Sequence, residues 1–212
     1  MSVITKFPGT SPAISDADAR VADYPISDIF LNRWSPRAFT GENIPDVVLN
    51  TLFEAVRWAP SSTNSQPWRL LYARHEHPDF QRFLGIINAR NQRWAKNASA
   101  LIVVVSKKFK SNPGTNSATP APQHSFDTGA AWGLLALQAS LLGWVAHAIG
   151  GFDHEAAREA LSIPEDYHVD VTIAVGKQGD KSILPEDLQL RELPSKRLPV
   201  SQIAFAGGFP RD

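Results

Sequence analysis

The spacing of hydrophobic residues predicts a helix early in the chain. It opens at Ile44-Pro45-Asp46 and ends before Pro60, because proline suits a helix start and the residue before a proline avoids the helical conformation. Inside this segment the apolar positions recur at i, i+3 and i+4, the spacing of one buried helix face. These positions are Val48, Leu49, Leu52, Phe53 and Val56. A shorter helix is predicted over 28–34, behind Ser27 as its N-cap.

Apolar runs predict strands at 68–73, 100–106, 144–149 and 168–175. The run at 100–106 is continuously apolar and rich in β-branched residues, which is typical of a strand buried on both faces. Further helices are predicted over 78–94 and from Asp153 to Leu161. Residues 111–123 carry no charge and suit no regular element, so they predict a long surface loop.

The segment 125–142 is helical in pattern and apolar on nearly every side. A helix without a polar face is buried all round, and in a chain of 212 residues this favours burial against a second subunit. The apolar stretch 129–149 is interrupted by Gln138, Ser140 and His147, so it makes a poor membrane span.

Composition excludes several classes of protein. The chain has 21 Lys+Arg and 21 Asp+Glu, so bulk electrostatics would hold it neither to nucleic acid nor to a membrane. Without cysteine it has no disulfide, no thiol nucleophile and no Cys-ligated metal. Charged residues make up only 20% of the chain, and a charge-poor surface at zero net charge favours association into oligomers.

The length favours one domain, and we expect an N-terminal arm over 1–25 and a single domain over 26–212. After Gly179 the chain is rich in proline and is expected to run to its end as an extended arm. The N-terminus lacks the apolar core of a signal peptide, so a cytoplasmic location is expected.

Two polar clusters stand out as candidate binding segments. In Arg33-Trp34-Ser35-Pro36-Arg37, two arginines with a serine between them can grip an anion, because a guanidinium matches phosphate oxygens in a bidentate way. A solvated helix end explains the same residues. In the segment 59–68, hydroxyl and amide side chains stand in a row between Pro60 and Pro67, which suits a flat heterocycle with carbonyls and ring nitrogens. An ordinary polar turn is the alternative.

Two smaller features follow later in the chain. Gly150-Gly151 allows close approach of backbone to a ligand, although paired glycines also simply form turns. Lys196-Arg197 is a basic pair near the C-terminus, where a surface charge is the plain interpretation. No glycine-rich phosphate motif of the Rossmann or Walker type occurs in the chain.

Together these segments resemble the nitroreductase family of FMN-dependent oxidoreductases, over about 29–205. The resemblance rests on Arg-x-Ser-x-Arg-x-Phe at 33–39 and on the longer Ala-Pro-Ser-Ser-x-Asn-x-Gln-Pro-Trp at 59–68, with weaker pieces at 149–151, 174–177 and 197–199. It implies an α+β fold with a central, mainly antiparallel sheet flanked by helices, built as an intertwined homodimer with an extended C-terminal arm. FMN would lie at the subunit interface.

The resemblance also assigns cofactor-binding residues by position. Those that match the contacts to the pyrimidine edge and phosphate of FMN are Arg33, Trp34 (through its backbone), Ser35, Arg37 and Arg197. Those that match the loop supplied by the partner subunit are Pro60, Ser61, Ser62 and Asn64, with Gln66 beside them. Those that match the turn beside the reactive ring nitrogen are Ile149, Gly150 and Gly151. Ser195 departs from the pattern, since several relatives carry a basic residue there.

The implied activity is oxidoreduction by the flavin itself, so no side chain is expected to be catalytic and no metal is expected. NADH or NADPH would reduce the flavin, and a nitroaromatic, quinone or similar electron-poor acceptor would take the electrons in a ping-pong order. Within the family, reductive dehalogenation or flavin cleavage stay open, as does a non-catalytic flavin-binding protein. The substrate stays open too, because 107–124 matches no substrate-specific subgroup.

Two interpretations outside the family use other residues. A hydrolase would need Ser61 or Ser62 with a histidine and Asp127, but no Gly-x-Ser-x-Gly elbow is present. His75-x-His77 could ligate a metal as a strand pair, but a solvated loop is the better explanation, since the pair lies at a strand end next to Pro78 with Glu76 between.

Overall fold

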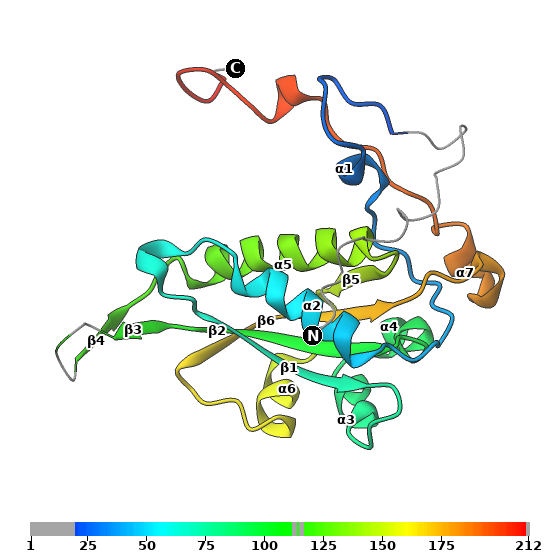
Figure 1. Ribbon diagram of the computed structural model, residues 1–212, viewed down its shortest axis with the longest axis horizontal. Coiled ribbons are helices and arrows are strands. Elements are labelled where there is room, and N and C mark those ends of the chain that lie inside the picture. Colours follow the sequence, from blue (N-terminus) through cyan, green and yellow to red (C-terminus); the bar gives the residue numbers. More distant parts are fainter. Residues whose placement is uncertain (1–19, 112–113, 115–116, 211–212) are drawn as a thin grey trace.

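A four-stranded antiparallel sheet forms the centre of the computed structural model, which describes residues 20–111, 114 and 117–210 (Figure 1). Its strand order is β1-β2-β6-β5. The strands are β1 (Trp68–Arg74), β2 (Ala100–Lys107), β5 (Val145–Ile149) and β6 (Tyr167–Gly176). The α+β class and the antiparallel sheet inferred from the sequence are therefore confirmed.

Helices cover both faces of this sheet (Figure 1). On one face lie α2 (Asp46–Arg57) and the long α5 (His124–Leu141), which pack against each other. On the other face lie α3 (Phe80–Gly85), α4 (Ala89–Ala95) and α6 (His154–Ala160). Each layer encloses its own hydrophobic core.

Strand β2 shows why its sequence is apolar throughout. Leu101 and Val103 belong to the core under α3 and α4, whereas Ile102 and Val104 belong to the core under α2 and α5. All four side chains are buried, because the strand lies between β1 and β6 and has helices on both faces.

The segment predicted as one helix over 78–94 is two helices, and that prediction was wrong about the break. Ile87 forms an isolated antiparallel bridge with Phe152, and the Asn88 N–H donates to the Gly151 carbonyl at 3.0 Å. Asn88 then caps α4 by accepting from the Asn91 N–H. A contact distant in the sequence therefore interrupts the helix.

The segment predicted as an irregular loop over 111–123 is partly regular. Strand β3 (Phe109–Ser111) pairs antiparallel with β4 (Ala118–Pro120) in a short hairpin. The Ala121 N–H donates to the Lys108 carbonyl, and the Lys108 N–H donates to the Asp166 carbonyl, both at 2.8 Å. These two bonds fix the base of the hairpin to the body of the protein.

The C-terminal segment leaves the body later than predicted. After β6, the helical turns η3 (Lys181–Ile183) and α7 (Glu186–Gln189) pack on the body through buried Leu184 and Leu188. From Leu193 to Pro210 the chain is exposed except for half-buried Pro194, and over this described range its regular structure is limited to the turn η4 (Val200–Gln202).

The exposed C-terminal segment runs beside the first described residues and α1 (Asp28–Asn32), and both project away from the sheet (Figure 1). The Val200 N–H donates to Asp23 Oδ2 at 2.7 Å, which links the two segments. Of the arm predicted over 1–25, residues 1–19 lie outside the described part. The division at residue 25 and the homodimer stay predictions.

The described helices include none with the length and apolar character needed to cross a membrane.

Core packing in α2 leads to a stability prediction. Leu52 is fully buried against α5, whereas Val47 on the same helix is 54% exposed. Leu52→Ala should lower the free energy of unfolding by about 2–5 kcal/mol, because it leaves a cavity in the core. Val47→Ala, the matched control, should change it by no more than about 0.5 kcal/mol. Urea denaturation of both variants gives the comparison; equal losses would contradict the packing described.

Candidate functional site

A buried carboxylate fixes the segment 33–39 to the body. Glu192 is only 6% exposed, and it accepts hydrogen bonds from the backbone N–H groups of Arg37 and Ala38. The Arg37 guanidinium lies 3.5 Å from the same carboxylate. Because a buried charge is stable only when it is paired and hydrogen-bonded, Glu192 holds this segment in one position.

His147 of β5 also holds the segment 33–39 in place. Its Nδ1–H donates to the Pro36 carbonyl at 2.9 Å, and its ring packs on Trp94 with centroids 4.7 Å apart. Burial lowers the pKa of His147 to about 4, and the charges of Arg37 and Arg33 act in the same direction. The imidazole is therefore neutral near pH 7, and it adds no charge to a region that already holds two arginines.

Three arginines gather beside this segment, and none of them has a carboxylate partner in the part of the chain that the structure describes. Burial lowers the pKa values of Arg20 and Arg33, and the nearby charge of Arg197 lowers both further. The Arg20 Nη1–H groups donate to the carbonyls of Leu31 and Arg33 at 3.1 and 2.8 Å. Among the described residues, its buried Nε has no hydrogen-bond partner, and none of these arginines takes part in an ion pair. Unneutralised guanidinium groups in one place form a site for an anion such as phosphate.

Two amide side chains meet the glycine turn after β5. A Cβ atom at Gly151 would lie 2.4 Å from Asn88 Nδ2 and 2.7 Å from Asn91 Nδ2, so any larger residue there would displace both amide groups. Gly150 is exposed, with open space around it. Backbone and amide groups therefore converge at a point that a ligand can approach.

The loop 60–66 is held in a strained conformation. Thr63, Asn64 and Gln66 have positive φ angles of 52°, 54° and 46°, a region that costs a non-glycine residue about 1 kcal/mol or more. Asp127 of α5 accepts from the Ser62 N–H at 3.0 Å, and Ser61 Oγ accepts from the Gln66 N–H at 3.0 Å. These bonds hold Asn64 exposed at the surface.

The two groups of residues in the motif segments 33–39 and 59–68 lie at opposite ends of α5. Ser62 contacts Asp127 in the first turn of that helix, whereas Pro36 contacts His147, which follows its last turn. Eighteen helical residues span about 27 Å, so the two groups cannot meet around one ligand within a chain. Figure 1 shows the same separation, with the cyan turn before β1 far from the blue α1.

The positions of these side chains argue against the two interpretations outside the family, a hydrolase and a metal site. Asp127 supports the backbone at Ser62, and Ser61 is an acceptor for the loop, so neither is arranged as part of a catalytic triad. His75 packs against Phe80, and His77 Nδ1 accepts from the Asp79 N–H. Among the described residues, no three His, Asp or Glu side chains gather as metal ligands.

The sequence alone does not identify several residues of this site. Arg20 lies in the proline-containing N-terminal segment, and Glu192 lies in a C-terminal segment without a period, so nothing local marks either. His147 looks like any core histidine on an apolar strand. Asparagine is a common N-cap residue, but Asn88 lies inside the helix predicted over 78–94, so its capping role shows only in the structure.

Comparison with known proteins agrees with the fold and with these segments. A model of the nitroreductase family matches residues 31–89 and 73–177. The chain belongs to the nitroreductase family.

Individual proteins are also similar to this chain, among solved structures and among curated sequences. A crystal structure described as an oxidoreductase containing FMN is 44% identical, with a TM-score of 0.89, and the alignment covers 94% of this chain and 100% of that one. An uncharacterized 15.4 kDa protein of Mycolicibacterium smegmatis is 32% identical over 129 residues, 60% of this chain and 82% of that protein. A Streptomyces coelicolor protein with the provisional name NADH dehydrogenase/NAD(P)H nitroreductase is 24% identical over 169 residues, 70% of this chain and 80% of that protein.

The burial of His147 makes the stability of this member of the nitroreductase family depend on pH. Below the unfolded pKa of about 6.5 the unfolded chain binds a proton, whereas the folded chain binds it only near pH 4. Acidification from pH 6.5 to 4 should therefore remove up to about 3 kcal/mol of stability.

The measurement is urea denaturation at a series of pH values, for the natural chain and for His147→Gln. Because the other titrating groups are shared, the difference between the two curves isolates His147. That difference should be constant above pH 6.5 and should shrink as the pH falls. Parallel curves over the whole range would show that His147 is not protected from protonation.

Proposed function

We propose that this chain is an FMN-dependent oxidoreductase that uses NADH or NADPH to reduce nitroaromatics, quinones or similar electron-poor molecules. The observation that carries the proposal is the group of Arg20, Arg33 and Arg197, which have no carboxylate partner among the described residues. The 44% identity to an oxidoreductase containing FMN supports the choice of that cofactor.

The residues present fit FMN. The arginine group would hold the phosphate, because guanidinium groups pair with phosphate oxygens through charge-assisted hydrogen bonds. Ser35 and Arg37 lie on the segment anchored by Glu192 and would face the pyrimidine edge of the ring system. Arg20 adds a third cation to a phosphate site that lacks a basic residue at Ser195.

When bound, FMN would supply the redox chemistry, accepting a hydride from the reduced nicotinamide and passing electrons to the acceptor. The protein's part is to position and to stabilise charge. Arg37 would stabilise negative charge near the pyrimidine carbonyls, and the Gly150-Gly151 turn would leave room beside the ring. The neutral His147 would fix the backbone at Pro36 without adding another cation. The nicotinamide donor and the electron acceptor would occupy the same exposed face of the flavin ring, one after the other.

The same proposal includes a homodimer, in which each site takes its loop 60–66 from the other chain. The separation of the two residue groups along α5 supports this, because the loop cannot reach the arginine group of its own chain. The projecting N- and C-terminal segments also expose large apolar side chains that a second copy would cover. They are Val21, Tyr24, Ile26, Phe30, Leu198, Ile203 and Phe209.

Substitution of the arginines tests the cofactor. The purified natural protein should be yellow, with non-covalent FMN. Arg33→Ala, Arg197→Ala and Arg20→Ala should each weaken FMN binding by about tenfold or more, since each removes a charge-assisted contact to phosphate. Fluorescence titration of the apoprotein with FMN measures this. Arg82→Ala, at an exposed arginine of α3 paired with Asp79, is the control and should bind normally. A colourless protein that takes up no FMN would refute the proposal.

Complementation between two defective variants tests the shared site. Arg33→Ala and Asn64→Ala should each impair FMN binding. If each site combines Arg33 of one chain with Asn64 of its partner, dimers that contain one copy of each variant have one intact site. After unfolding and refolding together, about a quarter of all sites should recover normal FMN affinity, by random pairing of two chains. Recovery of none would mean that both residues act within one chain.

A further inference from the structure

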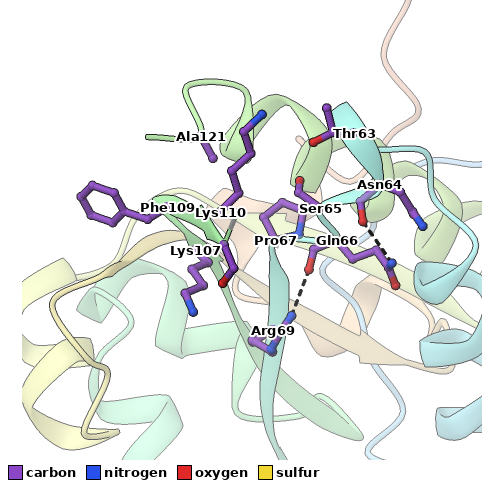
Figure 2. Close-up of a pocket in the computed structure, with 11 residues that line it drawn as sticks. Thr63, Asn64, Ser65, Gln66, Pro67, Arg69, Lys107, Phe109, Lys110 and Ala121 are labelled. Atoms are coloured by element: carbon purple, nitrogen blue, oxygen red, sulfur yellow. Dashed lines mark hydrogen bonds between the residues drawn. The ribbon is translucent and has the colours of Figure 1, made fainter. Parts of the chain in front are cut away.

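A pocket lies between the loop 63–67 and the β3–β4 hairpin (Figure 2). Its volume is about 580 Å³, which is within the range of small-molecule sites. The loop side contributes the side chains of Thr63, Asn64, Ser65 and Gln66, and the hairpin side contributes Phe109, Lys110 and Ser111. The pocket therefore opens beside the loop that carries Asn64.

All the charged residues that line this pocket are basic. Arg69, Lys107 and Lys110 line it, and no Asp or Glu is among the lining residues. Lys110 has no ion pair within the described part of the chain, and the Lys107 ammonium is 3.9 Å from its nearest carboxylate, on Asp166. In a chain with zero net charge, three cations in one pocket favour an anionic ligand.

The positions of the cations favour a ligand with more than one anionic group. Figure 2 shows the Lys110 ammonium extending past Ala121, while the Arg69 guanidinium lies on the other side, below Gln66. The Arg69 Nη1–H groups donate to the carbonyls of Gln66 and Trp68 at 3.0 and 2.6 Å, so this side chain is held in place. The hydroxyl groups of Thr63, Ser65 and Ser111 also line the pocket, and they can bond to the hydroxyls of a ribose.

We propose that this pocket binds the phosphate groups of the dinucleotide donor, with Lys110 and Lys107 as the specificity-determining cations. The inference rests on the proposed function, in which the loop 60–66 reaches the flavin of the partner subunit. A dinucleotide whose nicotinamide lies on that flavin would extend its phosphates along the same loop, into the pocket. Phosphate monoesters and diesters are anionic near pH 7, and lysine is a common phosphate ligand in proteins.

The first experiment measures binding without any reaction. Calorimetry with 1,4,5,6-tetrahydro-NADPH, which cannot donate a hydride, gives the affinity of the purified protein for a dinucleotide. Lys110→Glu should weaken it by about tenfold or more, and the double variant Lys107→Gln/Lys110→Glu should weaken it further. Lys181→Glu is the matched control, because Lys181 is exposed in η3 beside α7, at the far end of the molecule in Figure 1. Its affinity should equal that of the natural chain.

The second experiment separates phosphate recognition from damage to the flavin site. Anaerobic reduction of the flavin is followed by its visible absorbance, with NADPH and with 1-benzyl-1,4-dihydronicotinamide, which has no phosphate. Lys110→Glu should raise the half-saturating NADPH concentration by about tenfold and leave the rate with the phosphate-free donor unchanged. Equal slowing of both donors would overturn the proposal, and so would no effect on either.

A third experiment identifies which anion the pocket binds. If the variants leave tetrahydro-NADPH binding unchanged but weaken use of 4-nitrobenzoate relative to uncharged nitrobenzene, the pocket binds an anionic acceptor and the proposal is wrong. Failure of the proposed function is distinguishable from these results, because it would give a natural protein without FMN. Calorimetry still decides the pocket in that case, and absence of dinucleotide binding by the natural chain would also overturn the inference.

Discussion

The central constraint in this fold is that the sheet is buried on both faces. Strand β2 presents apolar side chains in both directions, so each face needs its own layer of helices. On one face the cover consists of α2 and of α5, a helix of 18 residues that lies against the sheet. Its length sets the distance between the loop 60–66 and the segment 33–39. The arrangement that buries the core therefore also separates the two halves of the candidate site within one chain.

A buried carboxylate connects the C-terminal segment to that site. Glu192 is the last buried residue before the exposed arm, and it bonds to two backbone N–H groups of the segment 33–39. Leaving a buried carboxylate unpaired would cost several kcal/mol, so the two segments are held together strongly. The point where the arm leaves the body is thus fixed relative to Arg37, and Arg197 follows only a few residues later.

Charge is distributed unevenly in a chain that is neutral as a whole. Arg20, Arg33 and Arg197 gather at one end, and Arg69, Lys107 and Lys110 gather at the other. Both groups lie next to backbone that tertiary contacts hold in place: the Glu192 anchor in one case, and the left-handed residues of the loop 60–66 in the other. In the proposed dimer the two groups would meet at each site, so that phosphate groups of cofactor and donor would be held by different chains.

The sequence by itself determined the elements that depend on local spacing. Leu49, Leu52 and Val56 are buried on α2 as their period predicts, and the apolar run of β2 is a strand with two covered faces. The motifs at 33–39 and 59–68 were enough to indicate the family, because their residue order is specific. The family match bears this out, whereas the individual contacts to FMN stay predictions.

Only the tertiary structure decided the features that depend on distant contacts. The bridge from Ile87 to Phe152 divides the helix predicted over 78–94, and the bonds at Lys108 and Ala121 organise the hairpin in a segment that looks irregular. Arg20 joins the anion site, and Glu192 anchors it, although neither has a local pattern around it. Local periodicity records which face of an element is buried, but it carries no information about which distant group neutralises a charge or caps a backbone N–H. Those partners are chosen when the chain packs, and that packing also sets the distance between the two halves of the candidate site.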